Sequence, residues 1–105
     1  MSEDRQQELV KTLKALSNPT RLKIIASLTD EPKHAYALAK ELGLSYPLTH
    51  LHLKGLRKIN LVKQIRQELR AEGLPTKKIY APAEFELILT PEKIRDVFKG
   101  KKEDE

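Results

Sequence analysis

Residues 36–60 read YALAKELGLSYPLTHLHLKGLRKIN and contain the two helices that decide the fold. A short helix is predicted over about 36–42, and Gly43 follows it in the position of a C-terminal stop. Ser45 is a good N-cap for a longer helix that runs to about Asn60, because a proline in the first turn does no harm there. A short helix, a turn that contains glycine and a capped longer helix together predict a helix-turn-helix.

Two further helices are predicted before this motif. The first covers about 2–16, where leucines recur at helical spacing on one face. Pro19 interrupts it, because proline disfavours the helical conformation at the residue before it. A second helix then runs over about 19–28 and ends in a turn at 29–32.

A β-hairpin is predicted after the helix-turn-helix. Residues 61–66 and 77–81 are rich in residues that favour strands. Between them, residues 71–76 carry the glycine and proline of a wide turn. Such a hairpin beside a helix-turn-helix is the wing of a winged helix.

The last part of the chain is predicted to form a strand or an extended segment over 85–89 and a helix over 91–98, with Thr90 as its cap. Residues 100–105 are charged, and we expect them to be disordered. The predicted class is mainly α with a small β-hairpin (α+β), a winged helix-turn-helix with an additional terminal helix. It forms a single domain over 1–99, with the helix-turn-helix at about 36–60, the wing at about 61–82 and the C-terminal strand and helix at about 85–99.

The composition of the chain excludes several classes of protein function. The chain has 105 residues and no cysteine, which excludes a disulfide framework, a thiolate metal site and a cysteine nucleophile. No apolar run approaches the ~18 residues of a membrane span, and the polar start MSEDRQQE does not resemble a signal peptide. Neither a glycine-rich phosphate loop nor a nucleophile–base signature is present. We therefore expect a cytoplasmic protein that is no enzyme, needs no cofactor and contacts no membrane.

The positive charge of the chain is concentrated in one block. The formal net charge is +5, yet residues 33–82 hold ten Lys and Arg against three acidic residues, a net of +7. An excess confined to the helix-turn-helix and the wing is the pattern expected of a surface that meets phosphates. The alternative is a solvated, lysine-rich face without a partner.

Several motifs resemble the ArsR-type family of winged-helix regulators, which are prokaryotic, bacterial or archaeal. Residues 16–25, LSNPTRLKII, are similar to the family's L-(S/G)-(D/N)-P-T-R-L-x-I-L, and residues 38–47, LAKELGLSYP, resemble L-A-x-x-L-G-L-S-x-P. Residues 52–57, HLKGLR, match H-L-K-x-L-R. Leu-Val at 61–62 matches the end of the family's G-L-V, with Asn60 in place of the glycine.

The resemblance covers about 9–82, and it implies a transcriptional regulator that binds double-stranded DNA as a homodimer. In the family, the first and last helices pair across a two-fold axis. Many members sense metals through a cysteine pair in the helix that corresponds to 34–42, or through acidic and histidine ligands in the last helix. Here cysteine is absent, no histidine follows His52, and His34 alone is no site. We therefore expect no metal site, and the sequence leaves the small-molecule effector unidentified.

The longer helix of the motif can be divided into two faces. At about 100° per residue, Thr49, Leu53 and Leu56 fall together and are predicted to face the core. The opposite face is predicted to enter the major groove. Leu51 lies on that face and has two interpretations: it packs on a thymine methyl group, or the helix is rotated and Leu48 or Leu51 packs on the wing or on a neighbouring subunit.

Three other side chains of this helix also carry predictions. Tyr46 contacts a base or a phosphate through its hydroxyl, or alternatively packs as a cap on the preceding helix. His50 and His52 point to different faces because they are two residues apart, which makes a shared metal site improbable. His50 is the candidate contact, and His52 is predicted to be a partly buried structural residue.

The wing cations flank the predicted hairpin turn and are expected to meet the DNA backbone or the minor groove. Glu68 and Glu72 interrupt them, so a solvated strand pair is the alternative. The complete set of candidate DNA-binding residues is Ser45, Tyr46, Leu48, His50, Leu51, Lys54, Arg57, Lys58, Arg66, Arg70, Lys77 and Lys78.

Apolar side chains at both ends of the chain exceed what one small domain needs for its core, which predicts a homodimer. The candidate interface residues are Leu9, Val10, Leu13, Leu16, Ile94, Val97 and Phe98. The alternative is that both stripes complete the core of one chain.

Two other functions stay open at this point. One is a winged helix that binds another protein, in which Leu48, Leu51 and Leu74 would be contacts. The other is an architectural protein that binds duplex DNA without sequence preference.

Overall fold

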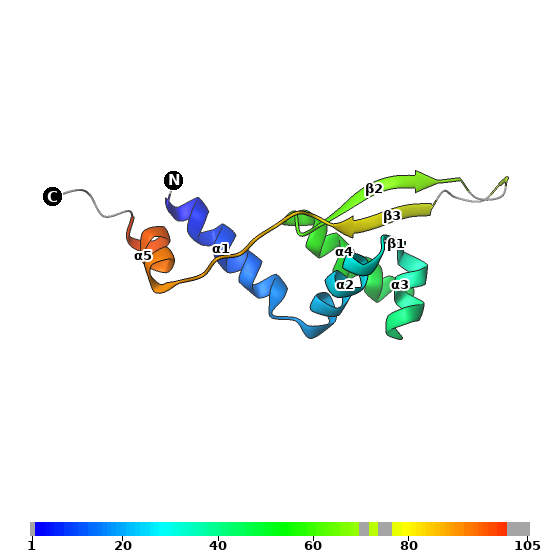
Figure 1. Cartoon of the computed structure of the whole chain (residues 1–105), viewed down its shortest axis with the longest axis horizontal. Coiled ribbons are helices and arrows are strands. Elements are labelled where there is room, and N and C mark those ends of the chain that lie inside the picture. The colour runs from blue at the N-terminus through cyan, green and yellow to red at the C-terminus, as the bar shows by residue number, and fades with distance from the viewer. Residues whose placement is uncertain (1, 70–71, 74–76, 101–105) are drawn as a thin grey trace.

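In the computed structural model, residues 2–69, 72–73 and 77–100 are described. The elements follow the predicted order, apart from one additional short strand (Figure 1). They are α1 (Ser2–Leu16), α2 (Pro19–Asp30), β1 (Lys33–His34), α3 (Ala35–Leu42), α4 (Tyr46–Lys58), β2 (Val62–Glu68), β3 (Lys77–Pro82) and α5 (Pro91–Lys99).

Most of the predicted helix boundaries are confirmed. Asn18 caps α2, because its side-chain oxygen accepts hydrogen bonds from the backbone N–H groups of Thr20 and Arg21. The predicted end of this helix was too early. The helix continues through Asp30, and the Thr29 hydroxyl within it donates to the Ile25 carbonyl oxygen at 2.7 Å.

The turns around the helix-turn-helix depend on two residues with positive φ. Gly43 ends α3 at φ 68°, in the left-handed region that glycine adopts without steric cost. Asn60 has φ 64° at the position where the family motif has glycine. Asparagine tolerates this conformation better than most residues, so its presence preserves the turn into the wing.

The three strands form one antiparallel sheet in the order β1-β3-β2. The wing consists of β2 and β3, and a bulge between Gln64 and Arg66 shifts their register. β1 was not predicted, since two residues are too short to show an alternating pattern. It pairs Lys33 with Tyr80 and His34 with Ile79, and this pairing attaches the start of α3 to the wing.

The buried core lies between the helix-turn-helix, α2 and the sheet. It is formed by Ala15, Ile24, Leu28, Ala35, Leu38, Leu53, Leu56, Leu61, Val62 and Tyr80. Within the described ranges, neither α5 nor the segment before it adds a residue to this cluster. We call α2, α3, α4 and the sheet the body of the protein.

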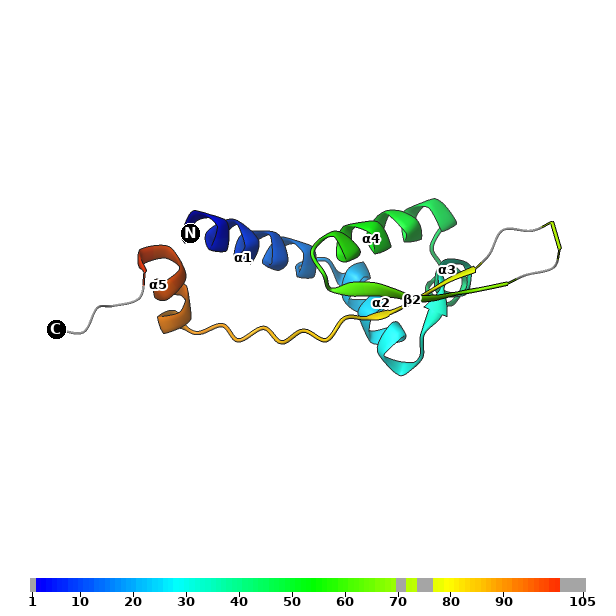
Figure 2. The same cartoon turned by 90° about the horizontal axis from the view of Figure 1, so that it is seen from above.

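Residues 83–90 connect the sheet to α5 as an extended segment (Figure 2). Of the two possibilities predicted for 85–89, a strand or an extended segment, the structure shows the extended segment, because these residues take no place in the sheet. Ala83 still donates to the Leu61 carbonyl oxygen at 3.0 Å, and beyond it the chain leaves the body. Phe85, Leu87 and Ile88 are exposed, and within the described part of the chain no strand pairs with this apolar segment.

α1, residues 83–90 and α5 form what we call the arm, which projects from one end of the body (Figures 1 and 2). The molecule measures 67 × 24 × 22 Å, and its radius of gyration is 17.3 Å. A compact domain of this length is expected to have a radius of gyration of about 13 Å. The arm therefore accounts for the elongated shape.

Candidate nucleic-acid interface

The N-terminus of α4 is fixed by the residue predicted to cap it. The Ser45 hydroxyl oxygen accepts from the Leu48 backbone N–H at 3.2 Å. The Ser45 carbonyl oxygen accepts from the Thr49 hydroxyl at 2.9 Å. These bonds satisfy groups that a helix end leaves unpaired, and they define the direction in which the first turn of α4 projects.

The two predicted faces of α4 are confirmed. Thr49, Leu53 and Leu56 are buried against the body. On the opposite side, 40% of Leu48 and 61% of Leu51 are exposed. In this chain the helix is therefore not rotated to bury either leucine, while a contact with a neighbouring subunit stays a prediction.

The polar side chains of the first two turns contact each other. The rings of Tyr46 and His50 meet edge to face, with their centroids 4.6 Å apart and their planes at 79°. Tyr46 remains half-exposed, and Ser45 rather than Tyr46 provides the cap. The contact holds the two rings together at the start of α4, with Tyr46 the more exposed of the two.

Basic side chains occupy the second half of α4. Lys54, Arg57 and Lys58 are all exposed, and the helix contains no acidic residue. The Arg57 guanidinium carbon lies 5.7 Å from the centre of the Tyr80 ring on β3, a cation–π distance. Burial raises the pKa of Tyr80, so the ring beneath Arg57 stays neutral at physiological pH. This contact connects α4 to the base of the wing.

An unpredicted contact holds α4 against α2. Arg21 Nε donates to Nδ1 of His52 at 3.1 Å, and His52 is buried as predicted. The guanidinium also lies over Gly55, where an added Cβ would come within 2.9 Å of Nη2 of Arg21. A glycine in the middle of a helix indicates a close approach of this kind, although sequence alone does not identify the partner.

The contact predicts a pH dependence of stability. Burial lowers the pKa of His52, with a further contribution from the charge of Arg21, so the folded protein binds a proton less readily than the unfolded chain does. The free energy of unfolding is therefore expected to fall as the pH drops below about 6.5, the ordinary value for histidine. Urea titrations between pH 5 and 8 measure this slope. In His52→Gln, which keeps an acceptor for Arg21 but does not titrate, the slope should be smaller; an unchanged slope would contradict the assignment.

A second unpredicted cluster positions α3, the first helix of the motif. Glu41 accepts from the Ser27 hydroxyl at 2.7 Å and lies 3.4 Å from the Lys33 ammonium. Lys33 also donates to the Ser27 carbonyl oxygen at 2.9 Å. The Ser27 hydrogen bond, supported by the charge of Lys33, holds the pKa of Glu41 below its usual value. These contacts connect α2 and β1 to α3.

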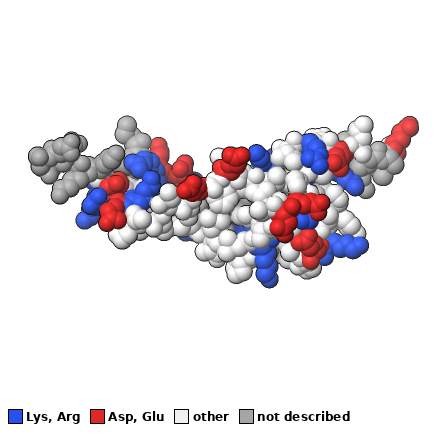
Figure 3. Space-filling view, in the orientation of Figure 1, with Lys and Arg blue, Asp and Glu red and all other residues white. Residues whose placement is uncertain are grey.

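On the wing, two of the predicted cations lie beside an acidic residue. Arg66 Nε lies 3.2 Å from a carboxylate oxygen of Glu68, and Lys77 stands opposite Glu68 in the strand register. Lys78 stands opposite the neutral Gln67. Arg70 lies outside the described residues. The solvated face seen in Figure 3 carries both signs of charge, whereas α4 lies behind α2 in that view.

The arm keeps apolar side chains exposed at its outer surface. α5 packs on α1 through the buried Val97, whose carbonyl oxygen is 3.5 Å from the Gln6 amide nitrogen. Ile94 and Phe98 stay 43% and 44% exposed. Val10 is also exposed, and Leu9 and Leu13 are half-buried. Leu16 packs on the core of the body instead, so this candidate interface residue is already used within one chain.

A groove of about 680 Å³ lies between the arm and the body. Its walls come from α1, from the turn at 58–61, from residues 85–87 and from α5. Among the described residues, no group of three or more His, Asp or Glu side chains is placed to hold a metal ion. Nor does that part of the chain contain a helix of the length and apolarity needed to cross a membrane.

Comparison with known proteins agrees with this geometry. Residues 18–64 match the family model described as bacterial regulatory protein, arsR family. An HTH-type transcriptional regulator of Methanocaldococcus jannaschii is 41% identical over 93 residues, which cover 89% of this chain and 95% of that protein. The match therefore includes both the body and the arm.

Solved structures share the fold. NolR of Sinorhizobium fredii is 32% identical with a TM-score of 0.64, covering 78% of this chain and 75% of that one. The transcriptional repressor BigR of Xylella fastidiosa is 25% identical with a TM-score of 0.61, covering 79% and 75%. A homodimeric winged helix-turn-helix DNA-binding domain of Mycobacterium bovis has a TM-score of 0.64 at 24% identity, covering 75% and 67%. With its helix-turn-helix, its wing and these relatives, the chain belongs to the ArsR family of winged helix-turn-helix transcriptional regulators.

Proposed function

We propose that the protein is a homodimeric regulator that binds specific sequences of double-stranded DNA, with α4 in the major groove and the wing on the backbone or in the minor groove. The observation that carries this proposal is the outward face of α4. It is exposed along its length, it presents Tyr46 and two leucines in the first two turns, and its second half is basic without any acidic side chain. Such a surface can enter the major groove with its first turns while its basic half contacts the phosphates that line the groove.

The arm supports the dimer. Ile94 and Phe98 on α5 keep more than two-fifths of their surface exposed in this chain, and Val10 on α1 is exposed as well. A second copy related by a two-fold axis would cover these side chains with identical ones, which is how an isologous interface forms. The Mycobacterium bovis domain with the same fold is homodimeric, which is consistent with this assembly.

In such a dimer the two α4 helices would lie about 34 Å apart and enter successive major grooves on one side of the duplex. We propose that residues 1–99 act as one domain in this assembly, with the helix-turn-helix at 36–60 and the wing at 61–82. The candidate DNA-binding residues keep the roles assigned to them above. Because the proposed target is chromosomal DNA, we place the protein in the cytoplasm. We also propose that it binds and releases DNA without catalysing a chemical step.

Selection of bound duplexes from a random-sequence library tests this function. The full chain is incubated with the library at about 0.15 M salt, and bound DNA is amplified over several rounds. We expect an inverted repeat whose half-sites are 10–10.5 base pairs apart from centre to centre, as the two-fold symmetry requires.

Two outcomes would overturn the proposal. Uniform binding that depends on salt but enriches no sequence would indicate an architectural DNA-binding protein. Failure to retain any duplex at low salt would indicate a winged helix that binds another protein.

A further inference from the structure

The outward face of α4 has an unusual composition for a helix that reads DNA. In its first two turns the side chains on this face are Tyr46, Pro47, Leu48, His50 and Leu51. Only the tyrosine and the histidine can form hydrogen bonds with base edges. The helix therefore offers few donors and acceptors where a recognition helix most needs them, and two leucines occupy the remaining area.

Leu48 and Leu51 do not belong to the buried core of the chain. Leu53 and Leu56 on the same helix are buried, whereas Leu48 and Leu51 face solvent. Leu48 and Leu51 are three residues apart, so they lie beside each other on one side of the helix. Together they form an apolar strip directly next to the Tyr46–His50 ring pair.

A second copy joined through the arm would not cover this strip. The first turns of α4 lie at the end of the body that is remote from the arm, next to α3 (Figure 2). The apolar surface proposed for the dimer is at the opposite end, on α1 and α5. A dimer joined through the arm therefore leaves the strip free to meet the ligand of α4.

The apolar group that base edges present in the major groove is the methyl group at C5 of a pyrimidine. Resting on the proposed DNA-binding function, we infer that Leu48 and Leu51 recognise C5-methyl groups in each half-site. Thymine carries this group in every duplex, and 5-methylcytosine presents the same group in modified DNA. Tyr46 and His50 then supply the hydrogen bonds that set the register beside the methyl contact, while Lys54 and Lys58 remain with the phosphates.

Deoxyuridine substitution tests the inference, because it removes only the methyl group of thymine. Each thymine of the selected half-site is replaced in turn, and the dissociation constant is measured by fluorescence anisotropy. At one or two positions we expect wild-type binding to weaken about fourfold, the effect of exposing one methylene-sized group. At the position that Leu51 contacts, the same substitution should have no effect on Leu51→Ala, which has already lost that contact, whereas a position contacted by Leu48 should stay sensitive.

A parallel set of duplexes carries 5-methylcytosine at each cytosine of the half-site. A gain of about fourfold there, without an effect of deoxyuridine, would assign the strip to methylated cytosine rather than thymine. Leu22→Ala is the matched control, since Leu22 is an exposed leucine on α2 outside the proposed interface. It should behave as wild type in both sets.

The inference is overturned if a selected site binds the wild-type protein tightly and neither modification changes the affinity at any position. That result would leave the proposed DNA-binding function intact, and it would assign the two leucines to a contact with another protein. If no site can be selected, the proposed function itself has failed. Circular dichroism of Leu51→Ala should match wild type, because the replaced side chain is exposed and alanine favours helix.

Discussion

Placing glutamate at both Ile94 and Phe98 is expected to convert the dimer into a monomer and to weaken operator binding by about 10²- to 10⁴-fold. This range is the avidity that two linked half-site contacts gain over one. Both side chains are more than two-fifths exposed in the single chain, so the substitution leaves its core intact. In the dimer, the two carboxylates would have to be buried in an apolar interface, where unpaired charges are costly.

The measurement combines sedimentation velocity with a binding titration on the selected duplex. Lys99→Glu is the control, because it adds an acidic residue to α5 on the side away from Ile94 and Phe98. The control should remain a dimer and bind nearly as wild type. A double variant that still sediments as a dimer, or that binds with wild-type affinity as a monomer, would refute the role of the arm.

The second large effect concerns the cations of α4. Replacing Lys54 and Lys58 by glutamine removes two cations from each copy, four in the dimer, and should weaken binding roughly 10³-fold at 0.15 M salt, equally for all sequences. Each phosphate contact contributes about 0.9 to the slope of log K against log salt, so the loss of four contacts should lower the slope by about 3.6. Titrations at four or five salt concentrations measure both quantities.

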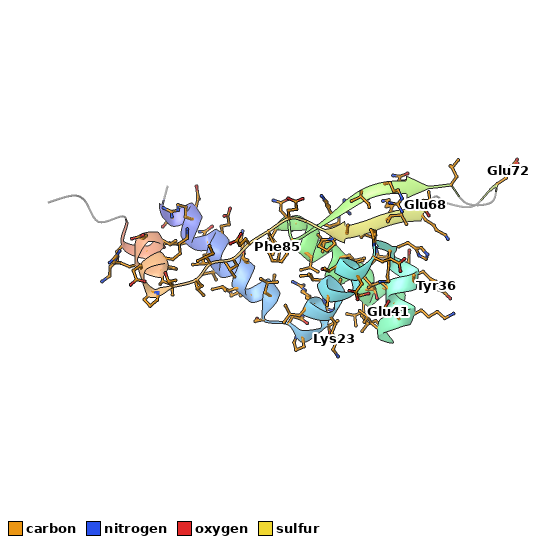
Figure 4. All side chains as sticks on the ribbon, in the orientation of Figure 1. Lys23, Tyr36, Glu41, Glu68, Glu72 and Phe85 are labelled. Carbon is orange, nitrogen blue, oxygen red and sulfur yellow. The ribbon has the colours of Figure 1, made fainter. Side chains whose placement is uncertain are left out.

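Lys23→Gln is the matched control for this pair. Arg21 faces α4, and two residues along a helix rotate the side chain by about 200°, so Lys23 points away from α4. Lys23 lies at the edge of the body opposite the wing (Figure 4). Its replacement should leave the slope unchanged. An unchanged slope in the Lys54 and Lys58 variant would mean that this half of the helix does not meet phosphates.

The wing is expected to contribute less than its sequence suggests. Glu68 lies within 3.2 Å of Arg66 and opposite Lys77, and it therefore offsets part of their charge. Counting cations along the sequence could not reveal the part that involves Lys77, because its pairing with Glu68 depends on the strand register, including the bulge after Gln64. The sequence did show that Glu68 interrupts the basic run.

The fold was largely predictable from local signals. Proline, glycine and capping residues bound α2, α3 and α4, and helical periodicity identified the buried side of α4 correctly. For residues 85–89 the sequence left a strand and an extended segment open, and the structure shows the extended segment, because a β-compatible sequence forms a strand only where a partner edge is available. Here the segment passes beyond the sheet and runs along the arm.

The contacts that position the two helices of the helix-turn-helix were not predictable in the same way. The Arg21–His52 hydrogen bond joins residues 31 positions apart, and the Ser27–Glu41 bond joins residues 14 apart. Neither pair follows a helical or strand period, so both depend on tertiary packing. Arg21 belonged to a recognised motif and Gly55 interrupted a helix, but only the structure shows that these two features meet.

The central claim is that two copies of the chain hold their α4 helices one turn of DNA apart. Because the chain contains no cysteine, Lys54→Cys provides one unique site for a spin label on each copy. Pulsed electron paramagnetic resonance, with saturating selected duplex, then measures the distance between the two labels. We predict a single population near 34 Å. The absence of any dipolar coupling between copies, or a distance far from one helical turn, would contradict the account.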